Sequence, residues 1–150
     1  MNFSTKARQA GMSLLELMIV VAIVSMIAAF AYPSYTDYIV NTKRTAAATA
    51  LMQVADRQQQ FFMDNKTYTG DLTNLGFAAN PLFISDDGNT VPAGDADAVY
   101  LVTLANVGVT TYTAIAAPLG QQLARDTKCG TMTLNQAGAR DALAGGDDCW

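Results

Sequence analysis

Few residues of this chain have the type and the position that chemistry requires, and the first of them is an acid in an apolar run. Glu16 is followed by Leu17 to Ala31, a stretch whose only polar side chain is Ser25. The run from Met12 to Tyr32 is long enough to cross a bilayer, because about 20 apolar residues suffice for a helix. An ionised acid in such a helix costs about 2.5 to 3.5 kcal/mol. Glu16 is therefore expected to have a charged partner.

The residues before the apolar run indicate what that partner is. Gly11 precedes Met12, and the leader before it carries Lys6 and Arg8 and no acid. A cut before Met12 would create an α-amino group one helical turn from Glu16. A second copy stacked beside the first could place its own Glu16 against that amine, and each buried charge would then have a partner. The alternative is that Glu16 is a tolerated polar residue near a membrane interface.

Catalytic and metal-binding arrangements find little support. The chain has no histidine, which excludes Ser-His-Asp, Cys-His and histidine-ligated metal sites. It also has no phosphate-binding loop, so we expect neither an enzyme nor a cofactor. A calcium site is the alternative for four acids between residues 80 and 98, but their spacing lacks the closing glutamate of a calcium loop. We expect a solvated loop there and no metal: Asp86, Asp87, Asp95 and Asp97.

Composition fits one modest domain and a membrane element. The chain has 150 residues, 51% of them hydrophobic, and loss of Lys6 and Arg8 with a leader would lower its net charge from −4 to −6. That acidity argues against a protein that coats nucleic acid along its whole surface.

The two leader cations, Lys6 and Arg8, place the amino end in the cytoplasm by the positive-inside rule, so residues after Tyr35 are expected outside. An oxidising compartment permits a disulfide between Cys129 and Cys149 there, worth about 3 kcal/mol for a loop of about 20 residues; two free thiols are the alternative.

The helix is expected to continue beyond the membrane run. Pro33 should kink it, because proline lacks an N–H and its ring collides with the preceding turn. After Pro33, apolar and small residues recur at spacings of three or four, which predicts an amphipathic helix to about Phe62: Tyr35, Tyr38, Ile39, Thr42, Ala46, Ala50, Val54 and Phe61. The other positions, which include Asp37, Arg44 and Gln58–Gln60, are predicted to be exposed. Turn-forming residues from Asp64 to Gly70 should end it, and residues 71–76 could form one helical turn before Gly76.

The second half of the sequence indicates an antiparallel sheet. Residues 80–98 are expected to be a loop, and strands are predicted at 99–105, 109–116 and 131–134, with a turn at 106–108. The alternation predicts that Tyr100, Val102 and Leu104 share one face, as do Met132 and Leu134. Such a sheet buries one face on the amphipathic helix, and the segment from Cys129 to Trp150 should complete it. The fold class is therefore α+β.

The stretch Gly11-Met12-Ser13-Leu14-Leu15-Glu16 resembles the prepilin motif of type IV pilins and type II secretion pseudopilins. The resemblance implies that a dedicated prepilin peptidase cuts after Gly11 and methylates the amino group of Met12. Most members of the family have Phe at the first mature position, and Met12 departs from that pattern. The family's fold has a long amino-terminal helix, half membrane segment and half amphipathic, packed on an antiparallel sheet. Pro33 matches the recurrent kink of that helix.

Two further stretches are similar to minor pilins of the PilE type: Arg57 to Thr69, and the cysteine-bounded region that ends in Cys149-Trp150. The resemblance implies a structural subunit, most like a minor pilin, with residues 1–11 as a cleaved leader, 12–35 as the membrane and assembly helix, and 36–150 as the globular domain. Its implied partners are other pilin subunits, the prepilin peptidase, the inner membrane and the pilus assembly platform. It would span the inner membrane once before assembly and lie in the extracellular pilus afterwards.

Two alternatives stay open at this point. One is a pseudopilin of a type II secretion system. The other is a minor pilin that binds DNA in natural transformation, because some pilins resembling this one are DNA receptors. Phosphate contacts require exposed cations, for which the candidates are Lys66, Arg125, Lys128 and Arg140. Scattered cations of this number are also ordinary on a protein surface.

Overall fold

The structure of the chain is a computed structural model that describes residues 12–145 and 148–150. It divides into two units, residues 1–37 and residues 38–150. The predicted leader, with Gly11, Lys6 and Arg8, lies outside the described residues. The described elements are, in chain order, α1 Leu14–Asn65, a 3₁₀ turn η1 Leu72–Leu75, β1 Leu82–Ser85, β2 Thr90–Val91, β3 Ala98–Ala105, β4 Thr113–Pro118, α2 Gly120–Arg125, β5 Met132–Asn135 and β6 Arg140–Ala142.

Helix α1 continues through Pro33, and apart from that proline its sequence contains no residue that usually ends a helix. No glycine occurs from Met12 to Asn65, and alanines and straight-chain residues, which favour helix, are frequent. The helix ends at Asn65, where Lys66 takes a left-handed conformation with a φ of 58°. Its end within the predicted turn region is confirmed. So is the helical turn that follows it, since η1 is capped by the Asp71 side chain and by Gly76 at a φ of 78°.

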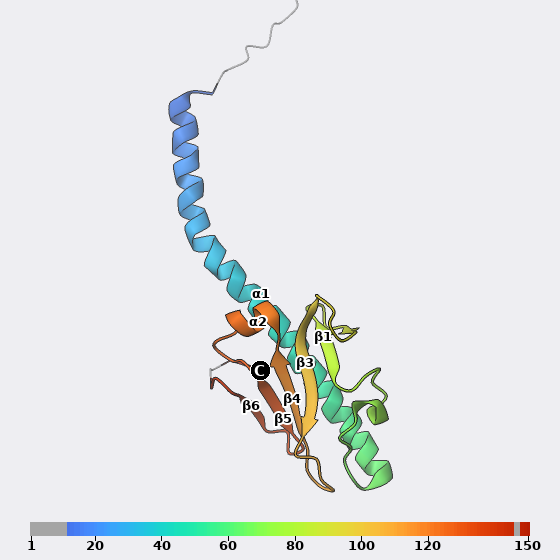
Figure 1. Cartoon of the computed structure of the whole chain (residues 1–150). Helices are drawn as coiled ribbons and strands as arrows, with labels where there is room; N and C mark the ends of the chain where they lie inside the picture. The colour runs from blue at the N-terminus through green and yellow to red at the C-terminus, as the bar shows by residue number, and fades with distance from the viewer. Residues whose placement is uncertain (1–11, 146–147) are drawn as a thin grey trace, which may run out of the picture. The chain divides into compact units, whose positions relative to one another are not determined.

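The sheet is antiparallel, and the strands described by the structure are ordered β2-β1-β3-β4-β5-β6. Figure 1 shows this sheet over the second half of α1, with α2 at the end of β4. One row of paired residues crosses five of the strands and is buried throughout: Leu82, Val102, Ala116, Met132 and Ala142. The first four of these side chains share one hydrophobic core with Leu51 and Val54 of α1, and Ala142 packs in a smaller cluster with Cys129 and Cys149. The α+β class and the predicted buried face of β3 and β5 are confirmed.

Three parts of the sheet region differ from the sequence-based expectation. The expected loop at 80–98 contains the hairpin β1–β2, because Leu82 to Ile84 is a short apolar run that pairs with β3. Strand β4 begins at Thr113 rather than at 109, because Asn106, at a φ of 51°, and Gly108 widen the preceding turn. Helix α2 was not predicted, since six residues are too few to show a helical period.

Candidate functional site

The first unit presents the apolar half of α1. Ser13 precedes the helix, and Glu16 lies in its first turn, where an acid interacts favourably with the helix dipole. The large apolar side chains from Leu14 to Tyr32 are exposed, with 78% for Leu14 and 81% for Phe30. By length and composition this helix could cross a membrane. Pro33 lies within α1, and a kink at that residue stays a prediction.

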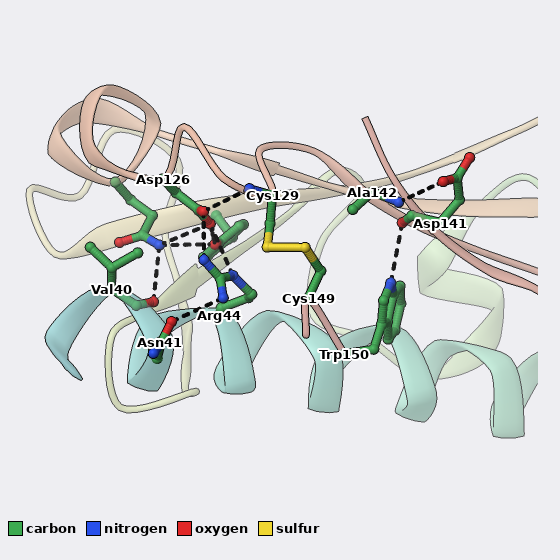
Figure 2. Close-up of a disulfide and its surroundings, with 11 residues drawn as sticks. Val40, Asn41, Arg44, Asp126, Cys129, Asp141, Ala142, Cys149 and Trp150 are labelled. Atoms are coloured by element: carbon green, nitrogen blue, oxygen red, sulfur yellow. Dashed lines mark hydrogen bonds and ion pairs between the residues drawn. A yellow bond between two sulfur atoms is a disulfide. The ribbon is translucent and has the colours of Figure 1, made fainter. Parts of the chain in front are cut away.

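In the second unit a disulfide joins the loop before β5 to the last residues of the chain. Cys129 and Cys149 form this bond, as predicted, and both are buried. Trp150 follows, half-buried, and donates a hydrogen bond from Nε1 to the Asp141 carbonyl at 3.2 Å. The Arg140 guanidinium lies 5.5 Å from the centre of the Trp150 ring. Figure 2 shows the disulfide beside Arg44 of α1 and Trp150 beneath Asp141.

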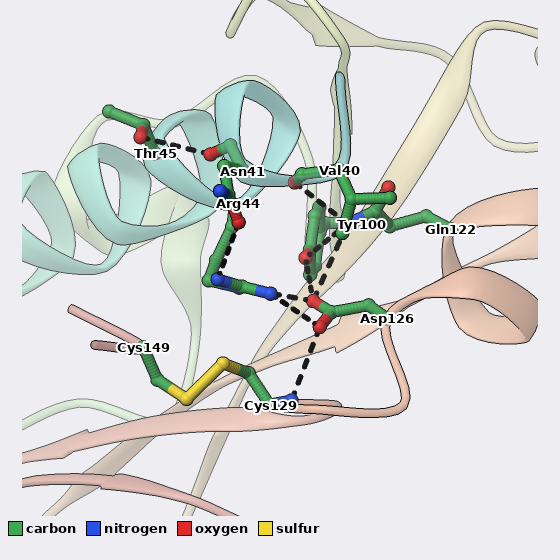
Figure 3. A network of polar contacts seen from close by, with 9 residues as sticks. All are labelled: Val40, Asn41, Arg44, Thr45, Tyr100, Gln122, Asp126, Cys129 and Cys149. Carbon is green, nitrogen blue, oxygen red and sulfur yellow. Dashed lines mark hydrogen bonds and ion pairs between the residues drawn. A yellow bond between two sulfur atoms is a disulfide. The ribbon is translucent and has the colours of Figure 1, made fainter. Parts of the chain in front are cut away.

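Next to the disulfide, Arg44 and Asp126 form an ion pair inside the domain. Arg44 Nη2 donates to Asp126 Oδ1 at 2.7 Å and Nε donates to Oδ2 at 3.3 Å, a two-pronged contact that fits both groups. The same carboxylate accepts from Tyr100, Gln122 and the Cys129 N–H at 3.2, 3.4 and 3.2 Å. Gln122 Nε2 also donates to the Val40 carbonyl at 3.2 Å. Figure 3 shows how α1, β3, α2 and the disulfide loop meet at Asp126.

These contacts determine which groups of the network are charged. Burial by itself would raise the pKa of the Asp126 carboxyl, but the hydrogen bonds and charge of Arg44 outweigh it and hold that pKa below its ordinary value. Burial also raises the pKa of the Tyr100 phenol well above its ordinary range. At neutral pH the carboxylate is therefore charged, and the phenol keeps the proton that it donates.

Two polar residues of α1 were predicted to be exposed, and that prediction is wrong. Arg44 is 6% exposed and Gln58 is fully buried. Gln58 Nε2 donates to the Thr69 carbonyl at 2.6 Å, and the Thr69 N–H donates to Gln58 Oε1 at 3.2 Å. A buried amide is tolerated because it replaces the hydrogen bonds of water with those of the backbone. Gln58 thus fixes the loop after α1 against the helix.

The structure does not bring the four candidate DNA contacts together. Lys66 follows the last residue of α1, and its Nζ donates to the Met63 carbonyl at 2.7 Å. Arg125 is the last residue of α2, and Lys128 lies in the turn between α2 and β5. Gln122 of α2 contacts Val40 of α1, and Asp126 at the start of the turn contacts Arg44. Lys66 follows Arg44 by 22 residues, or about 33 Å of helix. Only Arg125 and Lys128 are neighbours.

The register of β6 separates Arg140 from the outer face of the sheet. Arg140 pairs with Leu134, which is buried, so both lie on the side that faces α1; Asp141 pairs with Thr133 on the other side. Arg140 lines an open groove of about 340 Å³ between α1 and the β5–β6 hairpin. Asp56 lines the same groove, so a carboxylate as well as the Arg140 cation faces it.

Sequence-based reasoning missed Asp126, Gln122 and Tyr100 as the partners of Arg44. One signal was available for Asp126, since it is the only acid between Asp97 and Asp141. An isolated acid in a long stretch that has no other acid is a candidate for burial with a partner. Nothing in the sequence identified Arg44, 82 residues earlier, as that partner.

Two family models match the chain. One, described as "Type IV minor pilin ComP, DNA uptake sequence receptor", matches residues 33–133, and one described as the prokaryotic N-terminal methylation motif matches residues 6–32. Together they span the amino-terminal helix and most of the globular unit, so each of the two regions of the chain has its own match.

Curated relatives point the same way. Fimbrial protein Q of Moraxella bovis is 32% identical over 132 residues, which are 85% of this chain and 80% of that protein. The type IV major pilin PilA of Myxococcus xanthus is 37% identical over 71 residues, 47% of this chain and 32% of that protein. FimA of Dichelobacter nodosus is 42% identical over 74 residues, 49% and 43% of the two chains, so the match spans less than half of these two relatives. The chain belongs to the type IV pilins, with a minor pilin domain of the ComP type, and is a structural protein rather than an enzyme.

Proposed function

We propose that this minor pilin binds DNA and serves in its uptake. The observation that carries the proposal is the family match over residues 33–133, since the family is described as a DNA uptake sequence receptor. The match covers α2, the turn after it and the start of β5, and this part carries Arg125 and Lys128. The charge pattern supports the proposal. The chain is acidic as a whole, but its 43 residues from 98 to 140 contain one acid, Asp126, and that acid is buried in an ion pair.

The test is the affinity of the mature full-length chain in neutral detergent for a fluorescent DNA duplex of about 30 base pairs. Fluorescence anisotropy at about 50 to 200 mM salt should show binding that weakens steeply with salt, because each neutralised phosphate contributes about −0.9 to the slope of log K against log salt. Fragments that carry different sequences show whether binding is selective. No binding at the lowest salt would overturn the proposal.

We also propose how the subunit is processed and assembled, from its amino-terminal residues. The prepilin peptidase cuts after Gly11 and methylates the amino group of Met12, and residues 12–35 then hold the subunit in the inner membrane with its amino end in the cytoplasm. The match to the methylation motif over residues 6–32 supports this order. In the filament, Glu16 pairs with the amine of a neighbouring subunit. Residues 36–150 form the globular domain outside, and the partners are other pilin subunits and the pilus assembly platform.

A further inference from the structure

The acidic side chains of the globular unit are distributed unevenly along the chain. From Ala98 to Arg140 the only acid is Asp126. This stretch comprises β3, β4, α2 and β5. The segments just before and after it carry the acids at 86, 87, 95, 97, 141, 147 and 148. A DNA duplex would meet no exposed carboxylate of this stretch if the charge of Asp126 were neutralised.

Arg44 neutralises that charge from inside the domain. The side chain of Asp126 is fully buried and that of Arg44 is 8% exposed, with 2.7 Å between Nη2 and Oδ1. Because the two charges cancel out of contact with water, the charges that this turn presents to solvent are those of Arg125 and Lys128, both exposed. An acid that separates two cations in sequence is thereby removed from their surface.

The turn is also held in one conformation. The Asp126 N–H donates to the Gln122 carbonyl at 2.8 Å, and the Gly130 N–H donates to the Asp126 carbonyl at 3.0 Å. Inside this loop the Cys129 N–H donates to Asp126 Oδ1, and the disulfide fixes Cys129 itself. Thr127 and Lys128 are left outside these anchors, exposed with Arg125. Because the turn is already ordered before it binds, less conformational entropy is lost on binding.

We propose that residues 125–128 dock phosphates of a DNA duplex, and that Arg44 is the positioning residue that makes this turn cationic by cancelling Asp126. The proposal rests on the DNA-binding function proposed above and assigns it to one of the candidate places. Arg125 and Lys128 bind phosphate oxygens as cations, and the Thr127 hydroxyl is a third donor of the kind that contacts DNA backbones. Arg44 touches no DNA and acts through Asp126.

The first experiment compares the salt dependence of duplex binding by full-length variants in detergent. Arg125→Gln/Lys128→Gln should lower the affinity at about 100 mM salt by more than tenfold and reduce the slope of log K against log salt by about 1.8, since two phosphate contacts are lost. Lys43→Gln is the control, because the Lys43 ammonium lies 4.0 Å from the Asp86 carboxylate and is offset by it; it should leave the slope unchanged. An unchanged slope in the Arg125→Gln/Lys128→Gln variant would overturn the assignment.

The second experiment isolates Arg44. Arg44→Gln should weaken binding and reduce the slope by about 0.9, because the turn then carries an uncancelled carboxylate. Arg44→Gln/Asp126→Asn should restore the slope, since the amides leave no charge and retain hydrogen-bonding groups. A merely structural Arg44 would change the fraction of folded protein and not the slope. A slope that stays at the wild-type value in Arg44→Gln, with circular dichroism showing a folded chain, contradicts the role of Arg44.

The outcomes separate the two proposals. If the wild-type protein binds no duplex at about 50 mM salt, both the proposed DNA-binding function and this inference are overturned. Duplex binding whose slope falls in Lys66→Gln/Arg140→Gln and not in Arg125→Gln/Lys128→Gln keeps the function and overturns the docking turn. Equal binding of a poly-glutamate chain, lost in the same variant, would overturn DNA as the partner and assign the turn to acidic proteins.

Discussion

At the scale of single residues, the domain depends on a few polar groups that are buried with their partners. Arg44, Asp126 and Gln58 are removed from water, and each has hydrogen-bond partners from a distant part of the chain. Such pairs need not add stability over apolar residues of the same size, but losing one partner is costly because the other is left buried and charged. The stability of this domain should therefore respond sharply to single changes at these positions.

Arg44→Met should destabilise the domain by about 3 to 5 kcal/mol, because Asp126 is left as an unpaired buried charge. Arg44→Met/Asp126→Leu should cost clearly less, since neither charge is then present. Urea unfolding in detergent micelles, followed by the fluorescence of Trp150, the only tryptophan in the chain, measures both. Equal losses in the single and the double variant would show that the charge of Asp126 does not cause the destabilisation.

The lowered pKa of Asp126 predicts a loss of stability in acid. A carboxyl whose pKa is lower in the folded state favours folding above its unfolded value of about 3.9, and this contribution disappears as the pH falls through the folded value. Unfolding curves from about pH 7 to pH 2 should show a fall below about pH 4 in wild type that is smaller in Asp126→Asn. The exposed Asp71 and Asp87, whose pKa values are also lowered, contribute equally to both proteins. Parallel curves would contradict the prediction.

At the scale of elements, the sheet packs on α1, and the short elements are stable only through their contacts with other elements. Helix α2 has six residues, and its buried Gln122 and its final cap Asp126 are both held by other elements. A helix of that length is unstable alone. The β6 strand is similarly short and is followed by the residues that the disulfide ties to the loop before β5.

Removal of the disulfide should lower stability without unfolding the sheet. The bond closes a loop with a sequence separation of 20, for which the chain-entropy model gives about 3 kcal/mol. The free energy of unfolding of Cys129→Ser/Cys149→Ser should therefore be lower by that amount. Urea unfolding followed by circular dichroism measures it. Amide hydrogen exchange at β5 and β6 should increase more than exchange at β3. A uniform increase over all strands would contradict a local effect.

At the scale of the whole molecule, the chain has two units with opposite surface character. Residues 12–35 expose large apolar side chains, whereas residues 38–150 form a buried apolar core between α1 and the sheet. An exposed apolar helix of this length requires a lipid or protein environment. For a type IV pilin the two environments are the membrane before assembly and neighbouring helices after it.

Glu16→Ala should leave the globular domain and the processing intact and remove the subunit from filaments, because the proposed charge pair with the amine of a neighbouring subunit could not form. Intact mass and amino-terminal sequencing of membrane and sheared-filament fractions measure both effects. Wild type should start at Met12 with one added methyl group. Normal incorporation of the Glu16→Ala protein would contradict the pairing, and an uncut start at Met1 would contradict the proposed processing.

What the sequence determined by itself is what local patterns control. The long helix, its end before Gly70, the turn at 72–75 and the strand β3 follow from apolar periodicity and turn-forming residues. The disulfide was the expectation for two cysteines in a part of the chain that is predicted to lie outside the cytoplasm, and the structure confirms it. The resemblance at Gly11 to Glu16 pointed to the type IV pilins, which the family models confirmed.

Only the tertiary structure decided where the polar residues of α1 lie. Arg44 and Gln58 occupy positions that a helical pattern assigns to solvent, and they are buried because their partners come from 82 and 11 residues away. Register likewise decided that Arg140 faces α1, since a shift of one residue would place it on the other face. Local patterns record the preference of each residue for water, whereas burial of a charge depends on a partner that only the folded chain supplies.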